Sequence, residues 1–256
     1  MKIAVAGKGG VGKTTVAAGL CLLLAEQGRN PWAVDADPNN CLGYALGFPQ
    51  ELLDKVKPLS DMRQMLAERA GSSAGAGGMF ILNPEVTDII TDHEINYRDV
   101  SLLVMGTVDE GGTGCMCPEN ATLRTILREL VHSDRDLIVD MVAGLEHLGR
   151  ATAQAVDGLL IITQPNRSAL RTVPRIRKLA ADIGLTRMWV LGNNVSSDEE
   201  ADLIQQSIPQ MPLLGPLGHY PELQDDDVFA GVSGSNLKSD LSQVLTKLQL
   251  QLDGDA

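Results

Sequence analysis

GKGGVGKTT, residues 7–15, stands between a short apolar run and a long helical pattern, and it fits the phosphate-binding loop Gly-x-x-x-x-Gly-Lys-Thr. In such a loop the glycines let successive backbone N–H groups converge on phosphates, and the following helix adds the positive end of its dipole. Lys13 is expected to contact the β- and γ-phosphates and Thr14 to bind Mg²⁺. The nucleotide-binding residues predicted from this stretch are Gly9, Gly10, Val11, Gly12, Lys13, Thr14 and Thr15.

Around this loop, patterns typical of buried strands alternate with helical patterns. Runs rich in Val, Ile and Leu predict strands buried on both faces, at residues 2–7, 31–35, 100–106, 136–140, 158–163 and 188–193. Helical patterns cover residues 14–28, 119–132, 167–183, 199–207 and 236–250. This alternation predicts an α/β fold, a doubly wound and mostly parallel sheet flanked by helices on both faces. The length of 256 residues suits one α/β domain or at most two small ones, and we expect a single P-loop ATPase domain over residues 1–256.

Composition narrows the classes of partner. The net charge is −12 and no contiguous block of lysines and arginines occurs, which argues against nucleic acid and anionic membranes as partners. No apolar run approaches the roughly 20 residues of a membrane-spanning helix. The first residues lead directly into the glycine loop without a signal-peptide cleavage pattern. These features predict a cytoplasmic protein whose partners are proteins and small ligands.

The loop contains one lysine more than phosphate binding requires. From Lys8 to Thr15 the sequence matches the pattern Lys-Gly-Gly-x-Gly-Lys-Thr-Thr and resembles the deviant-Walker ATPases, which include the nitrogenase iron protein, MinD and the arsenical pump ATPase. The resemblance implies hydrolysis of Mg-ATP to ADP and phosphate by a homodimer. It also implies that Lys8 reaches the nucleotide of the other subunit and stabilises transferring charge, as an arginine finger does.

Further residues match this family by position. Asp37 matches the aspartate that orients the attacking water, and Asp35 is expected to support the magnesium shell. Asp140 matches the Walker B aspartate, which implies that it binds Mg²⁺ through water. Gly144 would let the second switch, which continues through residues 146–150, approach the γ-phosphate. As simple alternatives, Asp35 or Asp37 could serve as a helix cap.

Two residues fall where the family binds the purine base. Asn193 corresponds to the position that recognises the edge of the base, and Pro216 lies near the loop that covers it. An amide offers both a donor and an acceptor, which suits adenine.

Cys115 and Cys117 lie one residue apart, directly before a predicted helix that starts at Pro118 and Glu119. The helix dipole favours thiolates at this position. Two cysteines cannot complete a tetrahedral site, but two subunits related by a two-fold axis would supply four thiolates for a soft or borderline divalent metal. The alternatives are a redox pair and two partly buried small side chains.

The Cys-x-Cys pair, the stretch DADPN at 35–39 and the stretch EHLGR at 146–150 together resemble the CooC type of nickel-insertion accessory ATPases. This resemblance implies Ni²⁺, or Zn²⁺ in its place, on Cys115 and Cys117 of both chains. The implied client is apo carbon monoxide dehydrogenase or a related nickel enzyme such as acetyl-CoA synthase.

Two other classes stay open. One is an iron–sulfur reductase component, against which Ala143 counts because it occupies a ligand-cysteine position of those reductases. The other is a regulatory ATPase of the MinD kind, against which the mixed charge of the last helix counts. Cys21 is expected to pack in the core, Cys41 has no assigned role, and His147 is a candidate for testing.

Overall fold

The computed structural model describes residues 1–71, 81–106, 118–141, 156–223 and 236–254, and within these ranges eight strands form one sheet in the order β3-β4-β2-β5-β1-β6-β7-β8. All neighbouring strands pair in parallel except the edge pair β3–β4. The strands are β1 (Lys2–Gly7), β2 (Trp32–Ala36), β3 (Ile95–Tyr97), β4 (Val100–Val104), β5 (Leu137–Met141), β6 (Gly158–Thr163), β7 (Met188–Gly192) and β8 (Leu213–Pro216). The fold is therefore the predicted doubly wound, mostly parallel α/β sheet.

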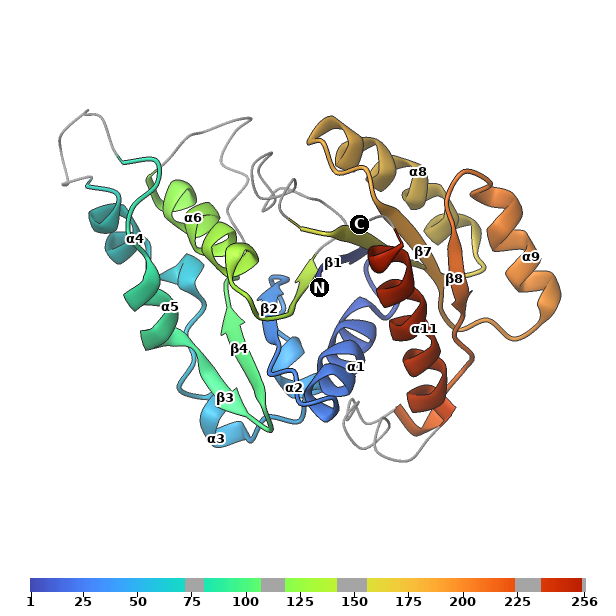
Figure 1. Ribbon diagram of the computed structural model, residues 1–256, viewed down its shortest axis with the longest axis horizontal. Helices are drawn as coiled ribbons and strands as arrows, with labels where there is room; N and C mark the ends of the chain where they lie inside the picture. Colours follow the sequence, from blue (N-terminus) through green and yellow to red (C-terminus); the bar gives the residue numbers. More distant parts are fainter. Residues whose placement is uncertain (72–80, 107–117, 142–155, 224–235, 255–256) are drawn as a thin grey trace.

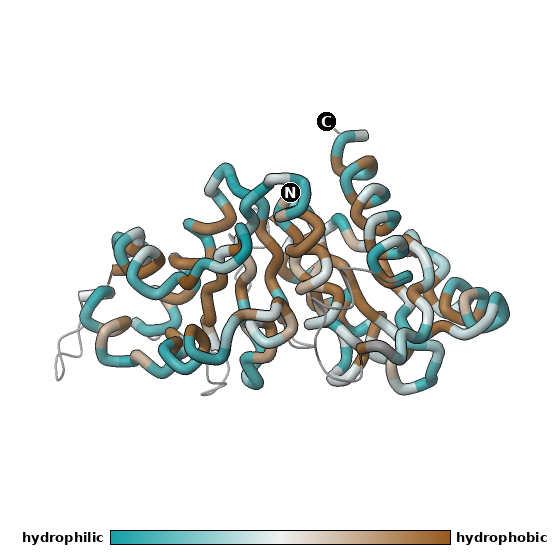
Figure 2. Tube along the Cα trace, turned by 90° about the horizontal axis from the view of Figure 1, so that it is seen from below, coloured by the Kyte–Doolittle hydropathy of each residue, from teal (hydrophilic) through white to brown (hydrophobic). Residues whose placement is uncertain are grey.

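Helices cover both faces of the sheet (Figure 1). One face packs against α1 (Lys13–Glu26), α2 (Leu42–Ala45) and α11 (Asn236–Asp253), and the other against α4 (Arg63–Arg69), α5 (Thr87–His93), α6 (Pro118–His132), α8 (Arg167–Asp182) and α9 (Asp198–Ser207). The short elements α3 (Gln50–Leu53), η1 (Leu59–Asp61) and η2 (Pro221–Leu223) lie in connections. Hydrophobic residues concentrate along the strands and the inner helix surfaces, as Figure 2 shows.

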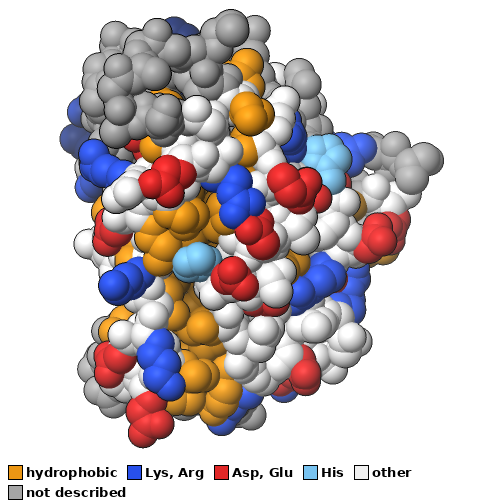
Figure 3. Space-filling view, turned by 90° about the vertical axis from the view of Figure 1, so that its left-hand side faces the viewer, with side chains coloured by type: hydrophobic (Ala, Val, Ile, Leu, Met, Phe, Trp, Pro, Cys, Tyr) orange, Lys and Arg blue, Asp and Glu red, His pale blue; other side chains and the backbone are white. Residues whose placement is uncertain are grey.

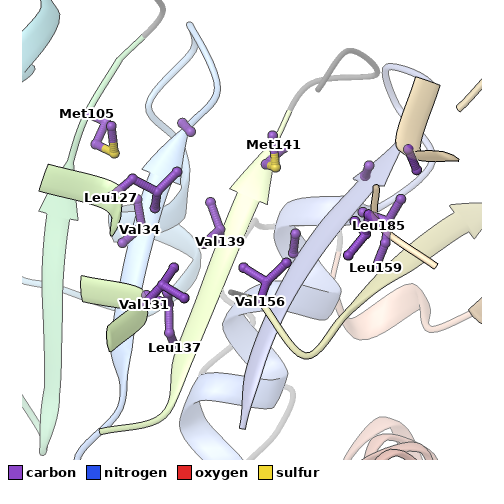
Figure 4. Packing of buried hydrophobic residues seen from close by; sticks show 14 of the residues in the cluster. Val34, Met105, Leu127, Val131, Leu137, Val139, Met141, Val156, Leu159 and Leu185 are labelled. Carbon is purple, nitrogen blue, oxygen red and sulfur yellow. The ribbon is translucent and has the colours of Figure 1, made fainter. Parts of the chain in front are cut away.

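The two hydrophobic layers follow from strand alternation. In β5, Leu137 and Val139 face the α6 side, whereas the residue between them, Ile138, faces α1. Leu127 and Val131 of α6, spaced by four residues, share one helix surface and pack over these strands (Figure 4). Helix α1 is buried almost throughout, and Cys21 in it is fully buried, which confirms its predicted place in the core. Burial raises the pKa of the Cys21 thiol well above its usual value.

The predicted strands and helices are all present, with ends that differ by at most three residues. The sequence did not predict β3, β8 or the helices between β2 and β4. These elements are three to seven residues long, too short for a periodic pattern. Within the described residues, no helix combines the length and apolar character needed to cross a membrane.

The β3–β4 hairpin carries backbone strain that a substitution can relieve. Tyr97 pairs with Val100, so the turn has two central residues, Arg98 and Asp99, with φ of 50° and 59°. Both angles lie in the left-handed region, which disfavours residues with a Cβ. Asp99→Gly is expected to raise the free energy of unfolding by about 0.5–1 kcal/mol, measured by urea denaturation.

Asp99→Ala is the matched control, because it removes the same carboxylate but keeps the Cβ. Equal stability of the Gly and Ala variants would show that the backbone angle is not the cause.

Candidate functional site

The glycine loop lies at the centre of the sheet, where β1 pairs with β5 on one side and β6 on the other. Gly10 and Gly12 have φ of 79° and 93°, and Gly12, the N-cap residue of α1, is left-handed and offers no side-chain cap. A Cβ on Gly7 would collide with the carbonyl oxygen of Ile162, and one on Gly12 with Nδ2 of Asn193. The sequence therefore needs glycine at these points, and the first turn of α1 presents its N–H groups at this edge.

The two lysines of the loop have different surroundings. Lys13 is 6% exposed, and its Nζ lies 3.9 Å from Oδ2 of Asp37. Lys8 is exposed, although its carbonyl oxygen accepts a hydrogen bond from the N–H of Val11. Lys13 is thus directed into its own site, whereas the Lys8 side chain is accessible to a second molecule.

Asp140, at the carboxyl end of β5, is fully buried beside the loop. Its Oδ2 accepts a hydrogen bond of 2.6 Å from Oγ1 of Thr14, and its Oδ1 is buried without a hydrogen-bond partner among the described residues. Burial raises the Asp140 pKa to about 6, although the Thr14 hydrogen bond and the Lys13 charge oppose the rise. An anionic oxygen without a partner next to a hydroxyl fits a hard cation such as Mg²⁺.

Asp35 lies opposite Asp140 on the neighbouring strand β2 and is also fully buried. Its Oδ1 accepts the N–H of Asp37 at 3.1 Å, and its Oδ2 accepts the N–H of Leu42 at 2.9 Å. Burial raises the Asp35 pKa to about 7, against the lowering effect of these two backbone donors. In this structure Asp35 positions the loop that carries Asp37, and its support of magnesium stays a prediction.

The structure brings Asn193 and Pro216 to the same edge of the sheet, because Gly192 of β7 pairs with Pro216 of β8. Nδ2 of Asn193 donates to the carbonyl oxygen of Val11 at 2.8 Å, so this side chain holds the glycine loop. Its Oδ1 accepts no hydrogen bond from the residues that the structure describes, and it stays available to a purine amino group. Sequence reasoning anticipated the position of Asn193 but not its contact with the loop.

Two further residues of this edge were missed. Four buried side-chain polar atoms lack a partner in the described part of the chain, and they belong to Asn40, Glu94, Asp140 and Thr163. Three of these residues lie at the carboxyl ends of strands, at the edge that carries the glycine loop: Asn40 follows β2, Asp140 lies near the end of β5, and Thr163 ends β6. Asn40 Oδ1 and Thr163 Oγ1 are therefore candidate ligand contacts. The sequence feature that could have indicated Thr163 is a polar residue at the end of an apolar run, as in GLLIIT at 158–163.

Comparison with known proteins identifies the family. The model of the CobQ/CobB/MinD/ParA nucleotide binding domain matches residues 2–225. The chain belongs to this nucleotide-binding family.

Relatives within the family cover nearly the whole chain. The chain is 40% identical over 234 residues to the carbon monoxide dehydrogenase accessory protein CooC of Rhodospirillum rubrum, covering 91% of this chain and 89% of that protein. It is 41% identical over 231 residues to an uncharacterized ATP-binding protein of Methanocaldococcus jannaschii, covering 90% and 87%. With these relatives and this nucleotide-binding domain, the chain is a P-loop ATPase.

Solved structures show the same fold at lower identity. The septum site-determining protein MinD of Pyrococcus horikoshii, complexed with Mg-ADP, has a TM-score of 0.65 and 20% identity over 97% of this chain and 96% of that one. A putative plasmid partition protein of Borrelia burgdorferi, bound to AMPPNP, has a TM-score of 0.70 and 14% identity over 98% of both chains. The chain therefore has the MinD/ParA type of P-loop fold.

Part of the predicted site lies outside the described residues of this CobQ/CobB/MinD/ParA family member. Cys115, Cys117, Gly144 and the second switch at 146–150, with His147, fall there, so their roles stay predictions. Among the described residues, no group of three or more His, Cys, Asp or Glu side chains is arranged to hold a metal ion. Cys41 is exposed, and its Sγ donates to the carbonyl oxygen of Asn39.

Proposed function

We propose that the protein is an accessory ATPase of carbon monoxide dehydrogenase, which uses Mg-ATP in a homodimer to control the insertion of nickel into the apo-enzyme. The observation that carries the proposal is the 40% identity to CooC, which extends over 91% of this chain and 89% of that protein. The chain's own glycine loop, its stretches DADPN and EHLGR and its Cys-x-Cys pair support the same proposal.

The side chains around β1 indicate how ATP lies across the sheet edge. Carboxylates stand on the β5 and β2 side, whereas Asn193 and Pro216 stand on the β7 and β8 side. A cation and the γ-phosphate belong beside the carboxylates, so the purine belongs on the opposite side of the loop. Asn193 Oδ1 would accept the adenine amino group, and Pro216 would border the base.

Hydrolysis is assigned to residues beside the γ-phosphate. Lys13, with the N–H groups of residues 9–15, holds the phosphates, and Asp37 orients the attacking water. Thr14 Oγ1 and the unpartnered Asp140 Oδ1 would hold Mg²⁺, which neutralises charge on the phosphate oxygens when bound. Backbone approach at Gly144 completes the γ-phosphate contacts.

Dimerisation enters through Lys8. Because its side chain is exposed in the single chain, it can supply a positive charge to the nucleotide of a second copy. Hydrolysis then requires the dimer, and ATP that binds the dimer better shifts the population toward it.

The cargo metal is assigned to Cys115 and Cys117 of both protomers, directly before α6, which begins at Pro118. Their thiolates form a four-sulfur set at the two-fold axis, so metal binding and dimerisation are linked reciprocally. ATP thereby controls when the metal is held and when it passes to the client.

Equilibrium dialysis with Ni²⁺ and with Zn²⁺ tests this proposal on anaerobically reduced protein, with light scattering on the same samples with and without ATP. We expect one metal ion per dimer. Cys115→Ser/Cys117→Ser is expected to lose the metal and keep ATPase activity, because the nucleotide site uses neither residue.

Cys41→Ser is the matched control, since it removes one exposed thiol outside the pair, and it should bind metal normally. Undiminished metal in the double variant would place the ligands elsewhere. Iron with sulfide would favour the reductase class, and absence of stoichiometric metal would favour the regulatory class. Co-purification with acetyl-CoA synthase instead of carbon monoxide dehydrogenase would change the client.

A further inference from the structure

Helix α8 carries an unusual concentration of positive charge. Five of the 21 lysines and arginines of the chain lie in its 16 residues, together with one acidic residue, Asp182. The sequence has no contiguous basic block, because these residues are spaced along the chain. In the folded protein, the helix places most of them on one face.

Four of these residues form one surface, which we call the α8 basic stripe: Arg167, Arg171, Arg175 and Lys178. At 100° per residue they fall within about 80° of one another around the helix, over a length of roughly 16 Å. The buried residues Ala169, Val173, Ile176 and Ala180 lie on the opposite side, against the sheet. The stripe therefore points directly away from the core.

Among the residues that the structure describes, no acidic side chain pairs with the stripe. All four side chains are exposed, and within the described residues none makes a hydrogen bond or an ion pair. Two partly exposed basic residues elsewhere in the chain differ from the stripe in being paired, Arg69 with Asp88 and Lys238 with Glu26. The end of the molecule at α4 and α5, shown in Figure 3, has acidic and basic side chains interspersed around a hydrophobic band. Helix α8 lies away from that end, where it packs against the central strands β1 and β6 (Figure 1).

The stripe begins at the nucleotide edge. Asn166 caps α8 by accepting the N–H of Ala169, and Gln164, two residues earlier, donates to the carbonyl oxygen of Gly10 in the glycine loop. Arg167, the first residue of the stripe, is thus three residues from a direct contact with that loop. A partner bound along the stripe would lie next to the nucleotide.

We propose that the α8 basic stripe docks an acidic patch on the client protein, an inference that rests on the proposed function. Guanidinium groups pair with carboxylates in a bidentate manner, and spacings of about 6 Å along the helix match carboxylates spaced by four on a partner helix. A nucleic acid or an anionic membrane fits less well, because the chain as a whole carries −12 and four cations are few for a polyanion site.

The test compares two double variants with the same change of net charge. Arg171→Glu/Arg175→Glu reverses the middle of the stripe, whereas Lys55→Glu/Lys57→Glu reverses two exposed lysines between α3 and η1. Binding of the wild-type protein to apo carbon monoxide dehydrogenase from the same organism is measured by surface plasmon resonance. We expect the stripe variant to bind about tenfold more weakly or worse, with basal ATPase activity unchanged and the control variant unaffected.

The salt dependence of client binding is an independent test. Wild-type binding should weaken between about 0.05 and 0.3 M salt, and the stripe variant should lose that dependence. Equal client binding by both variants and the wild type would overturn the inference alone. Absence of binding by the wild-type protein would overturn the proposed function and this inference with it.

Three further results would assign the stripe to another occupant and overturn the inference. They are stripe-dependent binding of a 30-base-pair DNA duplex at physiological salt, stripe-dependent binding to phosphatidylglycerol vesicles, and loss of ATP-dependent dimerisation in the stripe variant by light scattering.

Discussion

Lys8→Ala is expected to lower the rate of ATP hydrolysis by about 10³-fold while ATP still binds, because a trans-acting cation stabilises charge that develops only during phosphoryl transfer. Lys13 is 6% exposed and directed toward Asp37 in its own chain, so it remains in place to hold the phosphates of the variant. The exposed Lys8 side chain has no such internal role. Binding is measured with a fluorescent ATP analogue, hydrolysis by phosphate release and dimerisation by light scattering.

Mixing two inactive variants tests whether Lys8 acts across the interface. Lys8→Ala lacks the cation but keeps its own Asp37, and Asp37→Asn lacks the water-orienting carboxylate but supplies Lys8. Their heterodimer contains one complete site, so an equimolar mixture should regain hydrolysis that neither variant has alone. Normal hydrolysis by Lys8→Ala, or no recovery on mixing, would contradict action in trans. Lys57→Ala serves as the control for loss of an exposed lysine.

The sequence predicted the nucleotide edge well because local chemistry dictates it. The left-handed angles at Gly10 and Gly12 suit glycine far better than other residues. The loop directly follows β1, a strand with a neighbour on each side, so its position is fixed at the carboxyl end of the sheet. Parallel pairing of β1, β5 and β2 then brings the loop, Asp140 and Asp35 together without further information.

Features that depend on long-range contact were not predictable in this way. The hydrogen bond from Asn193 to Val11 joins residues 182 positions apart, and the partnerless oxygen of Thr163 is defined by what surrounds it. The β3 strand has only three residues, too few for its alternation to stand out in the sequence, so pairing with β4 and the two-residue turn define it. The α8 basic stripe becomes apparent only when its four residues are placed on a helix, because they are not adjacent in the sequence.

Asp140→Asn is expected to stabilise the nucleotide-free protein at pH 8 and to abolish Mg-dependent ATP hydrolysis. Burial raises the Asp140 pKa from 3.8 to about 6, so between these values the folded state binds more protons than the unfolded state. The free energy of unfolding therefore falls as pH rises through this window, by about 2–3 kcal/mol once the carboxylate is fully ionised. Asparagine does not titrate, and its oxygen can still accept the Thr14 hydroxyl.

Urea denaturation at several pH values measures the difference between wild type and variant. We expect a gain of about 2 kcal/mol at pH 8 that shrinks as pH falls and disappears below about pH 3, where the wild-type carboxyl is protonated in both states. Asp134→Asn, which removes an exposed carboxylate from the loop before β5, should show no such pH dependence. A variant that is less stable than wild type at pH 8 would show that the buried charge is compensated.

The same atom explains both halves of the expected result. Asp140 Oδ1 has no hydrogen-bond partner among the described residues, and this costs stability in the absence of ligand. A cation that binds there with ATP removes that cost, so Mg-ADP should stabilise the wild-type protein more than the variant. If Mg-ADP raised the melting temperature of both proteins equally, Asp140 would not be a magnesium ligand, and the gain at pH 8 would reflect burial of charge alone.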